Sequence, residues 1–215
     1  MQHEVLVPII ASLAAAVLQA AGFQRMALAI RRDRASPNAC SWLIWSVVAT
    51  LAAASSWQAG ATWPLVGAVM NAVGCVAILS VTMAMGTFAA ARVDLVCLGV
   101  ATLGLAAWLA TDEPVVGLVL FLGADACGAI PTLRHVVVDP AREDTTGWGL
   151  LAMAGVAAVI SVEPHQWAWT WAAFGHWGGA VYVALVNLTI SISIVVVHQL
   201  ERLQTAATKP APTGE

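Results

Sequence analysis

The chain has 215 residues, of which 60% are hydrophobic and only 10% are charged, and its mean hydropathy is +0.83. Soluble domains usually carry about 25% charged residues, so a water-soluble fold is excluded and the missing polar surface must face lipid. The formal net charge is −3, and no basic patch or charge run occurs, which excludes nucleic acid as a partner.

Seven apolar segments follow one another along the chain, and a membrane helix needs about 20 such residues. They are Val5–Ile30, Cys40–Trp57, Trp63–Met85, Leu95–Ala110, Pro114–Val138, Gly147–Val162 and Trp167–Val197. The first segment is expected to be a retained helix rather than a secretory signal, because its positive charge, Arg25, comes after the apolar run. The sequence therefore predicts an all-α integral membrane protein with seven transmembrane helices.

The charged loops predict the orientation of these helices. With seven spans, all nine basic residues fall on one side, namely Arg25, Arg31, Arg32, Arg34, Arg92, Arg134, Arg142, Arg202 and Lys209. The opposite loops hold Glu4, Asp112, Glu113 and Glu163 and no basic residue. Because positive residues stay in the cytoplasm, we expect an inner (plasma) membrane protein with its N-terminus outside and its C-terminus inside.

Tryptophan residues cluster near the predicted ends of the spans. Trp57, Trp63, Trp108, Trp167 and Trp169 lie near the outer boundary, and Trp42 and Trp148 lie near the inner one. This pattern is typical of the aromatic belts that anchor helices at the membrane interface.

An internal repeat appears when the chain is shifted by 106 residues. The shift places Gln19 on Asp125, Gly22 on Gly128, Asp33 on Asp139, Trp42 on Trp148, Ala52 on Ala158 and Ser55 on Ser161. Deleting one residue from the next loop then places Asn71 on His176 and Gly74 on Gly179. We therefore expect a first three-helix repeat in residues 1–88, a linker helix in 89–113, a second repeat in 114–200 and a disordered cytoplasmic tail in 201–215.

Two parallel three-helix bundles joined by a linker helix form a known transporter plan. Two sequence motifs support a comparison with this plan: the stretch from Ser36 to Trp45, SPNACSWLIW, and the stretch from Asp125 to Leu133, DACGAIPTL. With these motifs, residues 5–198 resemble the SWEET and PQ-loop transporters. Pro131 matches the proline that this family often carries near the cytoplasmic end of helix five, and its counterpart in the first half is Arg25.

Asp125 is the acid deepest within any predicted span. An ionised carboxylate costs several kcal/mol at the bilayer centre, and such residues usually serve a function. Asp125 could couple proton movement to transport by gaining and losing a proton, or it could stay protonated in a structural hydrogen bond. Its repeat mate Gln19 could hydrogen-bond the same ligand.

Other polar and aromatic residues complete the expected pocket. The resemblance implies a polar residue from each third helix, and Asn71 and His176 match those positions. Asn187, further along the same helix, is a competing candidate, with helix–helix contact as its alternative role. Trp45 could stack on a flat ligand or serve only in packing.

A hinge is expected in the fifth helix, where Pro131 removes a backbone hydrogen bond three residues after Gly128; a static kink is the alternative. No metal site or cofactor is expected, because the four cysteines lack paired spacing and Asp125 with His176 supplies too few donors. No catalytic motif is present either, so the chain is not expected to be an enzyme.

These features predict a transporter that moves a small polar solute by alternating access, with protons as a coupled ion. Its other partners would be the lipid bilayer and, in a homo-oligomer, further copies of the chain. One alternative is a non-transporting receptor, regulator or assembly protein on the same fold. A second is an intramembrane enzyme that uses Asp125 and His176 as acid and base.

Overall fold

A computed structural model describes residues 2–58, 63–85, 91–110, 114–162 and 170–208. This part of the chain is all-helical and contains seven α-helices, as the hydropathy pattern predicts. They are α1 (Gln2–Arg31), α2 (Ala39–Gln58), α3 (Trp63–Ala84), α4 (Arg92–Leu109), α5 (Pro114–Val138), α6 (Thr145–Ile160) and α7 (Trp171–Thr208), with a short 3₁₀ helix, η1 (Pro140–Arg142), before α6.

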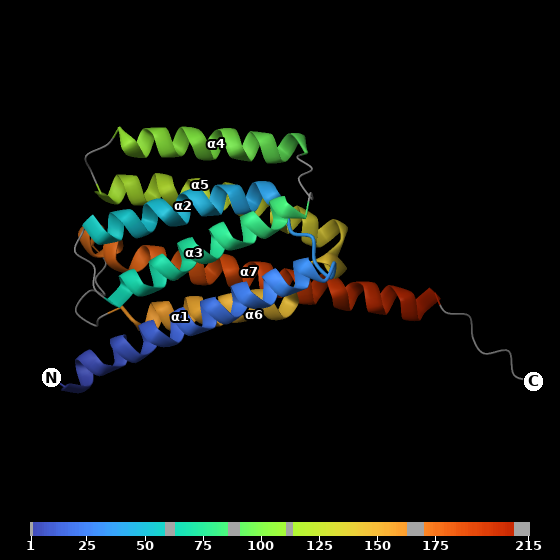
Figure 1. The fold of residues 1–215 in the computed structure, drawn as a ribbon, viewed down its shortest axis with the longest axis horizontal. Coiled ribbons are helices and arrows are strands. Elements are labelled where there is room, and N and C mark those ends of the chain that lie inside the picture. The colour runs from blue at the N-terminus through green and yellow to red at the C-terminus, as the bar shows by residue number, and fades with distance from the viewer. Residues whose placement is uncertain (1, 59–62, 86–90, 111–113, 163–169, 209–215) are drawn as a thin grey trace, which may run out of the picture.

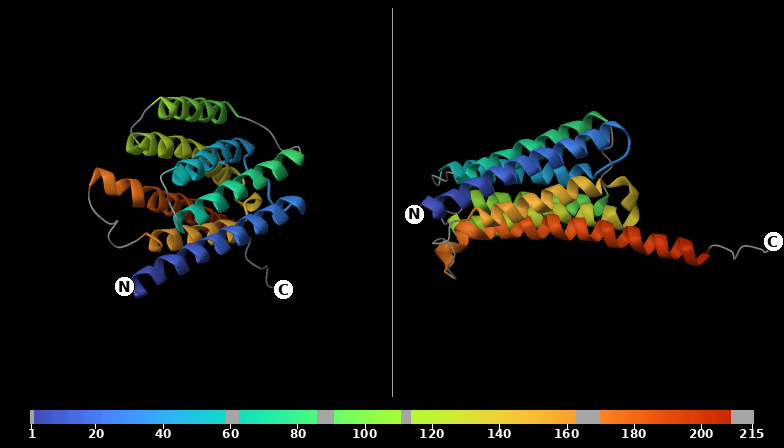
Figure 2. Two further views of the ribbon diagram at one scale, coloured as in Figure 1. Left: turned by 60° about the vertical axis from the view of Figure 1, so that its left-hand side comes forward. Right: turned by 90° about the horizontal axis from the view of Figure 1, so that it is seen from below.

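The helices run alternately in opposite directions, so that α1, α3, α5 and α7 share one direction (Figure 1). Helix α4 packs against α5 on the outer side of the bundle, as the left view of Figure 2 also shows. Helix α7 extends beyond the other helices toward the C-terminus (Figures 1 and 2).

The contacts between helices occur in matching pairs. Helix α3 packs against α1 and α2, and α7 packs in the same way against α5 and α6. Helix α1 packs against α6, and α2 packs against α5. Exchanging the first three helices for the last three therefore leaves this set of contacts unchanged.

Large apolar side chains cover much of the outer surface. Examples are Val17, Val73, Leu103 and Leu185, each more than half exposed. Soluble proteins rarely expose apolar surface on this scale. In the described residues, three segments are long and apolar enough to cross a membrane, Leu6–Arg31, Leu65–Ala84 and Trp177–Gln204, which indicates a multi-pass membrane protein.

The N-termini of α2 and α6 are capped in the same way, by residues that lie 106 positions apart in the sequence. The Asn38 side-chain oxygen accepts a hydrogen bond from the Ser41 backbone N–H at 3.1 Å. The Asp144 carboxylate accepts one from the Gly147 backbone N–H, also at 3.1 Å. Such caps satisfy backbone donors that have no partner within the helix.

The end of α1 is fixed by a left-handed residue, Asp33, whose φ is 52°. The Arg34 N–H donates to the Ala29 carbonyl and the Asp33 N–H donates to the Ile30 carbonyl, which is the Schellman arrangement. This stop turns the chain into the short connection to α2.

The prediction of a disordered tail in 201–215 is wrong for residues 201–208, which continue α7. This stretch, ERLQTAAT, contains mostly good helix formers, and the first proline after it is Pro210. Residues 209–215 lie outside the described part of the chain.

Close packing of α6 on α7 depends on Gly155. A Cβ atom at this position would lie 2.6 Å from the Ala184 Cα atom of α7, so a backbone would have to move. We expect Gly155→Ala to lower the free energy of unfolding by about 1–3 kcal/mol, as overpacking does, measured by denaturation in mixed micelles.

The matched control is Gly67→Ala in α3, where an added Cβ meets nothing within 4 Å. Alanine is the better helix former there, by up to about 1 kcal/mol, so this variant should be as stable as the parent or slightly more so. Equal effects of the two substitutions would contradict the described α6–α7 contact.

Candidate functional site

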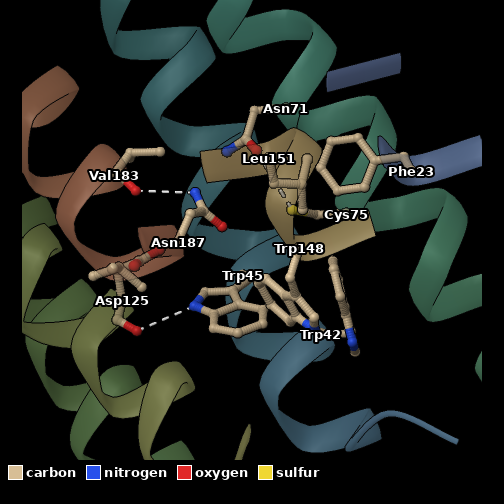
Figure 3. A pocket seen from close by; sticks show the side chains of 11 residues that line it. Phe23, Trp42, Trp45, Asn71, Cys75, Asp125, Trp148, Leu151, Val183 and Asn187 are labelled. Atoms are coloured by element: carbon tan, nitrogen blue, oxygen red, sulfur yellow. Dashed lines mark hydrogen bonds between the residues drawn. The ribbon is translucent and has the colours of Figure 1, made fainter. Parts of the chain in front are cut away.

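A cavity of about 40 Å³, counted as the space that the centre of a water molecule can reach, lies between the helices (Figure 3). Every α-helix except α4 contributes to its wall. The lining residues are Phe23, Trp42, Trp45, Asn71, Cys75, Asp125, Trp148, Leu151, Val183, Val186 and Asn187. A water molecule needs roughly 10–15 Å³ by this measure, so the cavity has room for about three.

Three polar side chains from three helices, Asn71, Asp125 and Asn187, line this cavity (Figure 3). The Asn187 amide donates to the Val183 carbonyl, one turn earlier in α7, at 2.9 Å. The Asn71 side-chain oxygen lies 4.0 Å from the Cys75 thiol. These contacts are weak or local, so much of the polar surface of both asparagines is left for a ligand.

Asp125 is partly buried near the middle of α5. Its backbone carbonyl accepts a hydrogen bond from the Trp45 indole at 3.2 Å. The Tyr182 hydroxyl of α7 faces its carboxyl group, although this buried oxygen makes no hydrogen bond of standard geometry within the described residues. None of the residues that line the cavity is basic, so no positive side chain in that wall neutralises the carboxylate.

Four aromatic rings form one wall of the cavity. The Trp42 ring lies 5.2 Å from Trp45, 5.9 Å from Trp148 and 6.2 Å from Phe23. The Trp45 and Trp148 rings are 5.8 Å apart and meet edge to face. Aromatic pairs in such arrangements gain about 0.5–1.5 kcal/mol beyond burial alone.

Trp42 and Trp148 are 1% and 2% exposed. The expectation that they anchor the helices at the membrane interface is therefore wrong. They are counterparts in the 106-residue shift, and each lies where its half meets the other, so they bury each other instead of facing the interface.

A buried acid connects the Trp148 ring to the start of α6. The Trp148 indole donates to one Glu143 carboxylate oxygen at 2.9 Å, and His135 Nδ1 lies 2.9 Å from the other. Glu143 is 6% exposed, so its carboxylate is removed from water but both oxygens are bound. This link fixes the orientation of the indole that closes the cavity.

Side chains also tie the two halves together where α1 ends and α6 begins, which we call the arginine end. Arg25 of α1 pairs with Asp144 at 3.3 Å, and Arg142 of η1 pairs with Asp33 at 3.2 Å. The Ser36 N–H donates to the Arg142 carbonyl. Exposed ion pairs of this kind contribute little stability each, so they are easily broken and re-formed.

The structure brings some of the predicted site residues together and places others elsewhere. Asn71, Asp125, Asn187 and Trp45 come together at the cavity. Gln19 does not line it. Gln19 is buried one turn before Phe23, and its side-chain oxygen has no hydrogen-bond partner among the described residues.

The remaining predicted residues lie in two helices. His176 belongs to α7, but its side chain lies outside the described residues. Gly128 makes room for Trp45, because an added Cβ would lie 2.7 Å from the indole nitrogen. Pro131 is buried inside α5.

The burial pattern of α3 matches that of α7 at a shift of 116 residues. Gly74 and Ile78 are buried, as are Ile190 and Ile194, and Val76 and Ile192 are both exposed. This register pairs Asn71 with Asn187 rather than with His176. The difference arises mainly because the first turns of α7, before residue 179, have no counterpart in α3.

Sequence reasoning did not find Glu143 or Trp148 as parts of this site. Glu143 lies in a loop, where an acid is expected to be solvated. The one available signal was the Trp42–Trp148 identity in the repeat, since matching aromatics in both halves fit an interface between them.

A search of protein-family models, of curated proteins and of solved structures finds no match to this chain.

The Glu143 link gives a testable prediction. Glu143→Ala leaves the buried Trp148 N–H without its acceptor, which should lower the free energy of unfolding by about 1–3 kcal/mol. Glu143→Gln keeps an acceptor for the indole and should cost less. Thermal unfolding of the detergent-solubilised protein measures both.

The control is Asp139→Ala, since the side chain of this exposed residue makes no capping hydrogen bond. It should unfold at the parent temperature. If Glu143→Ala also unfolds there, the described link does not hold Trp148.

Proposed function

We propose that this protein is a transporter of a small polar solute, which it moves across the inner membrane by alternating access. The observation that carries the proposal is the polar cavity with Asp125, lined by helices from both halves of the chain. A membrane carrier needs such a site between two units that can move relative to each other.

The proposed architecture is two parallel three-helix bundles joined by α4, with all seven helices crossing the membrane. The paired helix contacts support it, as do the equivalent caps at Asn38 and Asp144. This is the plan expected from the resemblance to the SWEET and PQ-loop transporters.

The proposed orientation puts the arginine end in the cytoplasm. The helix ends and connections at this end carry Arg31, Arg32, Arg92 and Arg142, and positive residues stay inside. The N-terminus of α1 is then outside and the C-terminus of α7 inside.

Alternating access would open and close the two ends of the cavity in turn. The Arg25–Asp144 and Arg142–Asp33 ion pairs join the halves at the cytoplasmic end, and the aromatic wall lies between the halves. Opening to the cytoplasm requires both to separate, and Gly128 with Pro131 gives α5 a place to bend. Protonation of Asp125 would change the charge of the cavity during this cycle.

A non-transporting receptor on the same fold is the second candidate. It would use the same cavity but open it to one side only. Accessibility of the cavity from the two sides therefore separates the two functions.

The Cys75 thiol lines the cavity and can report this accessibility. In a variant that keeps Cys75 and has serine at 40, 97 and 127, we expect the impermeant reagent MTSET to label the thiol in both right-side-out and inside-out vesicles. A Cys75→Ser version controls for background labelling. Labelling from one side alone would favour the receptor.

Proton coupling through Asp125 is tested in proteoliposomes that contain a pH-sensitive dye. A transported solute should drive a proton flux in the parent protein. Asp125→Asn should abolish that flux, because the amide does not gain or lose a proton near neutral pH. Asp139→Asn is the control. If Asp125→Asn and the parent respond alike to a pH gradient, protons are not coupled through this residue.

A further inference from the structure

Several N–H donors around the cavity already have partners, although the Trp42 indole N–H makes no hydrogen bond within the described residues. The Trp45 indole N–H is spent on the Asp125 backbone carbonyl, and the Asn187 amide N–H is spent on the Val183 carbonyl. The Trp148 indole N–H is spent on Glu143. The Asn187 carbonyl oxygen points away from Val183 into the cavity (Figure 3), and the Asp125 carboxylate has only acceptor atoms when ionised.

The charge of the cavity favours a cationic ligand. Asp125 is the one charged residue among those that line it, and the wall contains no basic side chain. A neutral or anionic solute would leave the carboxylate unpaired in an apolar bundle, which is unfavourable. A cation would neutralise it and donate hydrogen bonds to it.

The shape of the wall favours a flat, compact cation. Trp42, Trp45, Trp148 and Phe23 supply aromatic rings, whose faces attract cations and on which a planar guanidinium group can stack. The cavity has room for about three water molecules, which suits a ligand of a few non-hydrogen atoms.

We propose that the cavity binds a small, donor-rich organic cation of the guanidinium or primary ammonium class, held by Asp125, Asn187 and Asn71 against the tryptophan wall. The proposal names the substrate class of the proposed transporter. Binding of the cation does not depend on that function, and only its movement across the membrane rests on it. A proton and the cation compete for the Asp125 carboxylate, so one can be exchanged for the other.

The effect of pH on binding follows from this competition. Acid protonates Asp125 and removes the negative charge, so binding weakens as the pH falls. The titratable groups that face Asp125 among the described residues are Tyr182 of α7 and Cys75 of α3, and α2 presents Trp45, which does not titrate. Each of these two is neutral when protonated, so neither supplies a competing positive charge.

Guanidinium and urea are a matched pair of probes, because they have nearly the same shape and differ in charge. Tryptophan fluorescence of the detergent-solubilised protein reports binding, since three tryptophans line the cavity. At concentrations far below those that unfold proteins, guanidinium chloride should give a saturable change, and urea and sodium chloride should not.

Two variants test whether the charge of Asp125 is needed for binding. Asp125→Asn should weaken guanidinium binding about tenfold or more, because it replaces a charged hydrogen-bond acceptor by a neutral one, and Asp139→Asn should bind like the parent. Should Asp125→Asn not fold, the parent protein still decides the matter, through the guanidinium–urea contrast and the loss of binding in acid.

The inference is overturned if urea binds as well as guanidinium, if neither binds, or if Asp125→Asn keeps the parent affinity. Guanidinium that binds but is not taken up by proteoliposomes would leave this inference standing and would contradict the proposed transport.

Discussion

The carboxyl group of Asp125 lies near the middle of α5, at a cavity whose lining is mostly apolar. A buried carboxylate without polar partners is unfavourable, so the surrounding helices have to supply a polar environment. They do so with Asn71 and Asn187, which come from α3 and α7 and line the same cavity. The site therefore requires contact between segments from both halves of the chain.

The contact between the halves is itself made by aromatic residues. Trp42 and Trp148 hold equivalent positions in α2 and α6 and pack together with their ring centroids 5.9 Å apart. Glu143 holds the Trp148 indole from the loop before α6, which links the wall of the cavity to the arginine end.

Much of the fold could be predicted from the sequence, because apolar segment length reports the helices directly. Asp125, Asn71 and Asn187 could be predicted as site residues for a related reason: polar side chains are rare in apolar helices. Hydropathy could not show that Trp42 is buried, since a tryptophan near a helix end suits both an interface and a core.

Other parts of the site depend on tertiary structure. Glu143 is buried beside η1, which packs against α5 and α7, and no local pattern indicates this. The sequence alignment pairs Asn71 with His176 because the additional first turns of α7 cannot be recognised in the sequence. Gln19 is buried, as its position in an apolar helix suggests, but it lies a turn away from the cavity.

The central claim is that Asp125 faces Asn187 of α7 across a polar cavity that Asn71 of the first half also lines. Its most direct test replaces Asp125 and Asn187 with cysteine in a variant otherwise free of cysteine, and adds dibromobimane, which fluoresces when it bridges two thiols. The same experiment with Gly123→Cys in place of Asp125→Cys is the control, since an added Cβ at Gly123 meets nothing within 4 Å. We expect fluorescence from the first pair alone. No bridging of that pair, or equal bridging of both pairs, would show that Asp125 does not face the cavity.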